Sequence, residues 1–269
     1  MDPRSIITLL KDRLNLQEPV TLESQASGTV NSVFKLYDAQ QAFAVKWVGE
    51  DTFSGIDRFH QFVLQEQLAR RGMAPRPVWL SDDGRLWVEV WVNTACVPVE
   101  TDVVYTLASV LAHIHNQPVT ARPLNLEARW EHYIEVAGLD AASALVKQAD
   151  QLRPRLRASQ SSTNDLVLCH NDLSYGHIID QQHHIVVDWE YSAMGNRFFD
   201  LASCVMINDL SERQSERLCF YYAEQAGLPL HQVTRALAVQ SDIVALTNEL
   251  WQSALDASAS QALSPPVVL

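Results

Sequence analysis

The stretch that most constrains this chain is Leu166 to Ser203, LVLCHNDLSYGHIIDQQHHIVVDWEYSAMGNRFFDLAS. An apolar run, LVLC, is followed by a polar turn, and two further short apolar runs flank a turn signal at 180–184. This pattern predicts a strand, a loop and a hairpin, with the carboxylates of Asp172 and Asp188 at strand ends. Carboxylates so placed suit phosphoryl transfer, in which one orients and deprotonates a hydroxyl and the other holds Mg²⁺ on nucleotide phosphates.

Aspartate is also common in ordinary turns, because its side chain binds nearby backbone N–H groups. Each of the two residues, taken alone, therefore favours a turn. Their order in the chain favours a functional role over an ordinary turn. His-x-Asp is followed by a polar residue five positions after the Asp, and then by Asp-x-Glu after a hairpin. This order resembles the catalytic and metal-binding segments of the aminoglycoside phosphotransferase and choline kinase superfamily. The resemblance implies an α+β, protein-kinase-like fold, with a small antiparallel-sheet N-lobe and a larger helical C-lobe.

The segment DWEYSAMGNRFFD, residues 188–200, resembles the one that follows the hairpin in choline and ethanolamine kinases, where Asp-aromatic-Glu-Tyr-Ser leads to Arg-x-Phe-Asp. The resemblance implies that Glu190, Tyr191 and Arg197 belong to the substrate site. Trp251 resembles a late-helix Trp of the same family, although a core position explains it equally well. Aromatic faces and carboxylates can hold an ammonium group. The leading hypothesis is therefore ATP-dependent phosphorylation of a small amino alcohol such as choline or ethanolamine.

Two alternatives remain open at this point. Thiamine kinases share Asp-Trp-Glu-Tyr, so that motif does not separate a choline-type enzyme from a thiamine kinase or an antibiotic phosphotransferase. The other alternative is a nucleotide-binding relative with impaired or no turnover. The Arg197-to-Asp200 ending and the Asn208-Asp209-Leu210-Ser211 continuation favour the choline kinase type.

Composition excludes some partners. Hydrophobic residues make up 47% of the 269 residues and charged residues 19%, as in soluble globular proteins. The formal charge of −12 provides no basic surface for nucleic acid or an anionic membrane. Four scattered cysteines in apolar contexts indicate buried thiols in a reducing compartment. We expect no signal peptide and no membrane insertion, and hence a cytoplasmic protein that binds a nucleotide and a small alcohol.

The N-terminal part reads as strands over residues 20–23, 33–37 and 42–48, with small polar residues between the first two. An ordinary hairpin explains that loop in isolation. However, SGTVNSVFKLY resembles the phosphate-covering loop of choline kinases, and Lys46 lies in a strand similar to the one that carries the phosphate-binding lysine of kinases. The resemblance implies a nucleotide site that contains Gly28, Thr29, Asn31, Ser32 and Lys46.

Residues 56–71 predict a helix from the spacing of their apolar residues. In relatives a Glu of this helix pairs with the strand lysine, but here that position is Gln61, an amide that can hydrogen-bond Lys46 without neutralising it. Glu66 lies five residues on, about 140° round the helix, and is a poor substitute. The apolar strand over 85–93 occupies the place of the kinase hinge, where main-chain groups from Glu89 to Val92 would bind adenine; a core strand fits equally well.

Helices are predicted over residues 4–14, 103–116, 211–225 and 231–255. Residues 126–160 also read as helical, with a break or kink at Pro154. This distribution predicts a nucleotide-binding N-lobe over residues 1–92 and a helical C-lobe over residues 93–269 that carries the catalytic and metal-binding loops.

The proposed chemistry assigns one role to each residue of the central stretch. Asp172 would orient the acceptor hydroxyl, and His170 would brace the catalytic loop. Asp200 would tie that loop down, although capping the N-terminus of a helix is the simpler role for Asp200. Asp188 and His177 would hold the metal. The superfamily has Asn at position 177, and because imidazole suits softer ions than Mg²⁺, Mn²⁺ is possible. His177 would bind metal, bind a metal-bound water, or leave a single metal site.

Overall fold

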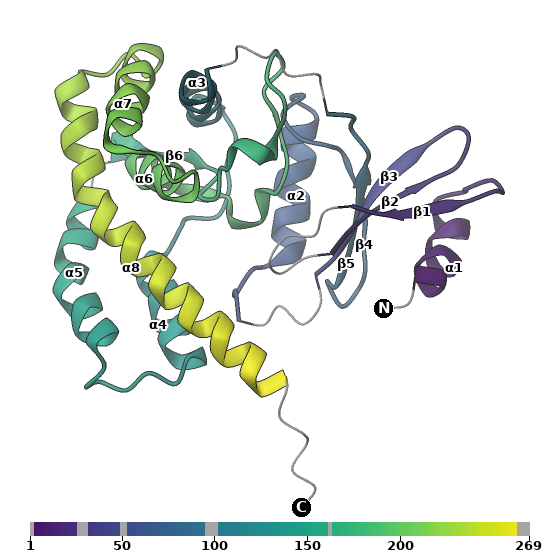
Figure 1. The fold of residues 1–269 in the computed structure, drawn as a ribbon, viewed down its shortest axis with the longest axis horizontal. Coiled ribbons are helices and arrows are strands. Elements are labelled where there is room, and N and C mark those ends of the chain that lie inside the picture. Colours follow the sequence, from purple (N-terminus) through teal and green to yellow (C-terminus); the bar gives the residue numbers. More distant parts are fainter. Residues whose placement is uncertain (1–2, 26–31, 49–52, 95–101, 161–162, 263–269) are drawn as a thin grey trace, which may run out of the picture.

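The structure is a computed structural model that describes residues 3–25, 32–48, 53–94, 102–160 and 163–262 (Figure 1). It confirms the predicted α+β fold class, because an antiparallel sheet near the N-terminus is followed by a larger helical part. The division at residues 92 and 93 stays a prediction. It falls between the last strand of the sheet and the first long helix of the helical part.

The N-terminal sheet has five strands in the order β1-β2-β3-β5-β4. The strands span Thr21–Ser24 (β1), Ser32–Tyr37 (β2), Ala42–Trp47 (β3), Pro77–Leu80 (β4) and Leu86–Val90 (β5). Helix α1 (Pro3–Arg13) buries Ile6 and Leu10 against Leu36, Val45 and Val88 of the strands. Helix α2 (Arg58–Ala69) lies on the other side, between the sheet and the helical part (Figure 1). The sheet thus carries Lys46 on β3 towards the helical part.

The helical part is built from α3 (Val103–His115), α4 (Leu126–Val136), α5 (Ala144–Gln160), α6 (Arg197–Ile207), α7 (Glu212–Ala226) and α8 (Leu230–Ala262). Two short antiparallel pairs lie between α5 and α6: β6 (Leu166–Cys169) with β9 (Ala193–Asn196), and β7 (Ile178–Asp180) with β8 (Ile185–Val186). Helix α3 packs on α7, and α6 packs on α8, around a core that includes Leu107, Leu111, Leu201, Leu218 and Tyr222. This core holds the loops between β6 and α6.

Of the break or kink predicted at Pro154, the break is wrong, since α5 continues through this residue. Its missing N–H leaves the carbonyl of Asp150 without a helical partner, but both residues are exposed, so water can satisfy that carbonyl. The interruption of the 126–160 region lies earlier, at Gly138, which has a φ of 62°.

Two further expectations concern cysteines and membranes. Cys169, Cys204 and Cys219 are free and buried, while Cys96 lies outside the described residues. Within the described ranges, none of the helices combines the length and the apolar character that crossing a bilayer requires.

Candidate active site

The loop after β6 is held by a buried carboxylate. Asp200, in the first turn of α6 and fully buried, accepts the backbone N–H groups of His170 and Asn171 at 2.8 and 2.7 Å. His115 Nε2 lies 3.0 Å from the same carboxylate. Burial alone would raise the pKa of Asp200, but the hydrogen bonds from His115 and His170 lower it overall. Asp200 therefore ties the loop down, as predicted, while the N-cap of α6 is Asn196.

Two polar residues of the site have left-handed backbones. Asn171 has a φ of 64° and Asp188 a φ of 68°, a region that Asn and Asp tolerate better than other side chains. Asn171 Nδ2 also donates to the backbone oxygen of Tyr191 at 2.9 Å, which joins the two loops. Such strained positions cluster at functional sites, because the surrounding contacts must hold them in place.

His170 is a brace between the same loops. Its Nε2 lies 3.1 Å from the carbonyl of Val187, which can only accept, so Nε2 carries the proton. Its Nδ1 is buried without a hydrogen-bond partner in the described part of the chain. Burial and the neighbouring His177 lower the pKa of His170 to about 4, so the ring is neutral near pH 7. The expectation that His170 braces the loop stays a prediction, and a neutral, fully buried ring supports it.

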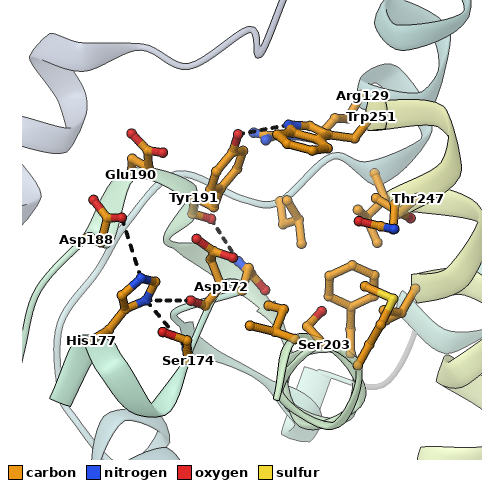
Figure 2. A pocket seen from close by; sticks show the side chains of 18 of the residues that line it. Arg129, Asp172, Ser174, His177, Asp188, Glu190, Tyr191, Ser203, Thr247 and Trp251 are labelled. Carbon is orange, nitrogen blue, oxygen red and sulfur yellow. Dashed lines mark hydrogen bonds and ion pairs between the residues drawn. The ribbon is translucent and has the colours of Figure 1, made fainter. Parts of the chain in front are cut away.

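Asp172, His177 and Asp188 form a cluster in which one ligand atom from each lies within 4.8 Å of the others (Figure 2). His177 Nδ1 lies 2.9 Å from the carbonyl of Asp172, so Nδ1 carries the proton, and the 3.4 Å approach of the Ser174 N–H to the same nitrogen is not a hydrogen bond. The other ring nitrogen, Nε2, lies 3.6 Å from Asp188 Oδ2. Fixing one ring nitrogen orients the other as a ligand.

This donor set fits a divalent cation. Two carboxylates and one imidazole suit Mn²⁺ and also allow Mg²⁺, which prefers oxygen. Burial, followed by the charges of Asp188, Glu190 and Asp200, raises the pKa of Asp172 to about 8. Negative charges brought this close together are what a bound cation would neutralise.

Lys46 faces this cluster from β3, with its Nζ 3.5 Å from Asp188 Oδ1 and 3.4 Å from Glu89 Oε1. Burial alone would lower the pKa of the lysine, but the charges of Glu89 and Asp188 raise it overall, so the ammonium is charged. Gln61 is not its partner, because Gln61 Oε1, the atom that could accept from Lys46, has no hydrogen bond in the described part of the chain, while Nε2 donates to the backbone oxygen of Ser192 at 3.0 Å. The anion that pairs with Lys46 within the N-terminal part is therefore on β5 and not on α2.

The side chain of Glu89 makes buried contacts that the sequence did not predict. Its side chain is 2% exposed and accepts from Gln65 Nε2 at 2.7 Å and Trp87 Nε1 at 2.9 Å, in addition to Lys46. Adenine binding by main-chain groups up to Val92 stays a prediction. Ser32 begins β2, while Gly28, Thr29 and Asn31 lie outside the described residues.

A cavity of about 420 Å³ opens beside the cluster, between the loops and helices α4, α6 and α8. Lys46, Asp172, His177, Asp188 and Glu190 lie at one end, and Figure 2 shows Thr247 and Trp251 on the α8 side. Helix α8 contributes Val244, Thr247, Asn248 and Trp251, a spacing of i, i+3, i+4 and i+7 that places them on one face. Apolar side chains line much of the remainder: Leu124, Leu126, Phe199, Met206 and Ile207.

The predicted substrate residues are only partly brought together. Tyr191 and Trp251 line the cavity, and Trp251 Nε1 donates to the Tyr191 hydroxyl at 3.0 Å. Glu190 also lines it, but accepts from Arg58 Nη1 at 2.5 Å. Arg197 does not line the cavity. It begins α6 facing the other way, donates to the backbone oxygen of Asn164 and lies 3.7 Å from Asp165, so we remove it from the substrate residues.

Sequence reasoning missed three residues of the site: Arg58, Arg129 and Asn171. Arg58 lies in the helix predicted over residues 56–71, but its partner Glu190 is 132 positions away. Asn171 had a local signal, since Asn tolerates a left-handed turn between a strand and a loop. Arg129 had none, because an Arg in an amphipathic helix ordinarily faces solvent.

Comparisons with known proteins agree with this fold. The sequence profile described as the phosphotransferase enzyme family matches residues 21–237. A choline/ethanolamine kinase family protein from Mesorhizobium loti superposes with a TM-score of 0.72 at 18% identity, over 97% of this chain and 87% of that one. Choline kinase LicA from Streptococcus pneumoniae gives 0.70 at 18% identity, over 96% and 98%. An aminoglycoside-3'-phosphotransferase of type VIII gives 0.63 at 19% identity, over 92% and 98%. A search of curated proteins finds no match.

The fold and the site define a kinase-like phosphotransferase. This chain belongs to the phosphotransferase enzyme family, since the family profile covers most of its length. The superfamily suspected from the sequence is thereby confirmed.

Proposed function

We propose that this protein transfers the γ-phosphoryl group of ATP to the hydroxyl of a small amino alcohol. The observation that carries the proposal is the convergence of Asp172, His177 and Asp188 within 4.8 Å, in a cavity that Lys46 also lines. A cleft that joins a lysine, two carboxylates and a space of about 420 Å³ fits a nucleotide's terminal phosphates beside a small acceptor.

Each residue of the chain has a distinct part in the proposed reaction. Lys46 is charged and placed to bind a nucleotide phosphate. Asp172, whose ionised form a bound cation would favour, accepts a hydrogen bond from the acceptor hydroxyl. It receives the hydroxyl proton as the acceptor oxygen bonds to the γ-phosphorus and the bond from that phosphorus to ADP breaks. Asp188 and His177 would hold Mg²⁺ or Mn²⁺, which when bound offsets the negative charge of the phosphates. His170 and Asp200 keep the loop in position.

The amino alcohol is supported by Tyr191 and Trp251, which line the cavity, and by the Asp-Trp-Glu-Tyr segment shared with choline and ethanolamine kinases. LicA, a choline kinase of similar fold, has been solved in complex with AMP, which supports a nucleotide in this cleft. A thiamine kinase remains the second candidate, because it shares the same four residues.

The test is ADP release from the purified protein with ATP, with Mg²⁺ or Mn²⁺, and with a panel of alcohols that includes choline, ethanolamine, thiamine and an aminoglycoside. Turnover that requires both an alcohol and the metal supports the proposal. Thermal stabilisation by ATP without ADP release from any alcohol would instead indicate a nucleotide-binding protein without turnover.

A further inference from the structure

The acceptor cavity contains a cation that the proposed chemistry does not use. Arg129, on α4, lines the cavity together with Tyr191 and Trp251 (Figure 2). Its guanidinium carbon lies 5.7 Å from the centre of the Tyr191 ring, over the ring face. The side chain is partly buried, so it is held against the cavity wall and does not extend freely into solvent.

Arg129 differs from the other cations of the site in having no counter-ion. Lys46 pairs with Glu89 and Asp188, and Arg58 pairs with Glu190. Among the described residues, no carboxylate lies within ion-pair distance of Arg129, whose side-chain contact is the face of Tyr191. A guanidinium presents a planar fork of donors that matches a carboxylate or phosphate, and in this cavity that fork is left for a ligand.

The same contact changes what the aromatic residues can bind. A quaternary ammonium is held by free aromatic faces, but one face of Tyr191 is covered by Arg129. Trp251 packs against Phe53, with ring centres 5.9 Å apart, and its N–H is bound to the Tyr191 hydroxyl. An acceptor with only a positive charge would therefore lie beside an uncompensated guanidinium, whereas an oxyanion would be attracted to it.

We propose that Arg129 is a specificity residue that binds an oxyanion of the acceptor, so that the acceptor is an alcohol carrying a carboxylate or a phosphate. This inference rests on the proposed function and narrows it: the amino alcohol also bears an acid group. The hydroxyl lies towards Asp172, and the oxyanion lies towards Arg129.

The experiment measures binding of matched alcohols to the full chain by titration calorimetry, with a non-hydrolysable ATP analogue and Mg²⁺ or Mn²⁺ present. Serine is ethanolamine with an added carboxylate, and glycerate and glycerol 3-phosphate are the carboxylate and phosphate partners of glycerol. The wild type should bind the acidic member of at least one pair about tenfold or more tightly than its partner, as expected for charge-assisted hydrogen bonds. The pair that responds distinguishes carboxylate from phosphate.

Three variants assign the effect. Arg129→Gln should reduce the preference to within about twofold, and Arg129→Lys should retain part of it, because the charge remains and the fork is lost. Arg122→Gln is the matched control, since Arg122 is exposed, pairs with Asp57 and does not line this cavity. It should retain the full preference.

The outcomes separate this inference from the proposed function. The inference is overturned if no acidic alcohol binds more tightly than its partner, if the preference survives Arg129→Gln, or if Arg129→Gln weakens only the nucleotide. Turnover of ethanolamine, with no acidic alcohol of any pair binding more tightly than its partner, overturns the inference alone. Binding of an acidic alcohol that depends on Arg129, without ADP release from any alcohol, overturns the proposed function alone.

Discussion

Replacing Glu89 by Gln tests whether the counter-ion of Lys46 is on β5. The substitution keeps the shape of the side chain and removes its charge, leaving a buried ammonium with Asp188, 3.5 Å away, as its remaining partner. At 3.4 Å and an effective dielectric constant of about 20, the lost attraction is about 5 kcal/mol. The remaining partner, the partial exposure of Lys46 and relaxation reduce this value, so we expect Glu89→Gln to lower the free energy of unfolding by about 3 kcal/mol.

The assay is urea denaturation at pH 7, with Gln61→Ala as the comparison. Gln61→Ala removes one neutral hydrogen bond to Ser192 and should lower the free energy of unfolding by about 1 kcal/mol. Glu89→Gln should also raise the KM for ATP, because Lys46 is no longer held in position. A loss below about 0.5 kcal/mol for Glu89→Gln, or a larger loss for Gln61→Ala than for Glu89→Gln, would refute the assignment of the lysine's partner.

Three further predictions concern the loops. Asp172→Asn should lower kcat at least about a hundredfold and leave nucleotide affinity nearly unchanged, whereas Asp188→Asn should also weaken metal-dependent nucleotide binding; initial rates and calorimetry separate the two. The pKa of His170 is about 4 in the folded state against 6.5 in the unfolded state, so its neutral ring contributes about 3 kcal/mol to the free energy of unfolding. This contribution is present above pH 6.5 and is lost as the pH falls to 4. His170→Gln should therefore flatten the pH dependence of the free energy of unfolding, measured in urea, over that range. His177→Asn should increase the ratio of activity with Mg²⁺ to activity with Mn²⁺, and an unchanged ratio would argue against His177 as a ligand.

Local patterns predicted most of the framework. Apolar spacing located α1, α2, α3, α7 and most of α8 to within a few residues, and turn signals located the β7–β8 hairpin. The two carboxylates were also predicted, because strand ends and an Asp-x-Glu after a hairpin are local features. Helix continuity through Pro154 was not, since it depends on exposure of the carbonyl that the proline leaves without a partner.

The errors at the site have a different origin. The partner of Lys46 was sought at position 61 because relatives carry a Glu there, yet the ion pair is supplied by the adjacent strand β5. Arg197 was assigned to the substrate from its motif, although its direction depends on the orientation of α6. Arg129 became a candidate only when α4, α6 and α8 were placed around one cavity. A single sequence does not reveal contacts between residues that are far apart along the chain.

Helix α2 is bound to the segment that carries Asp188 and Glu190 as well as to the sheet. Arg58 pairs with Glu190, Gln61 bonds Ser192, and the sheet's Lys46 pairs with Asp188. Any separation of the sheet from the helices would have to break all three together, in one cooperative step. If the protein has the proposed activity, the release of ADP would become slower at low ionic strength, where charged pairs are least screened, and faster as salt is added.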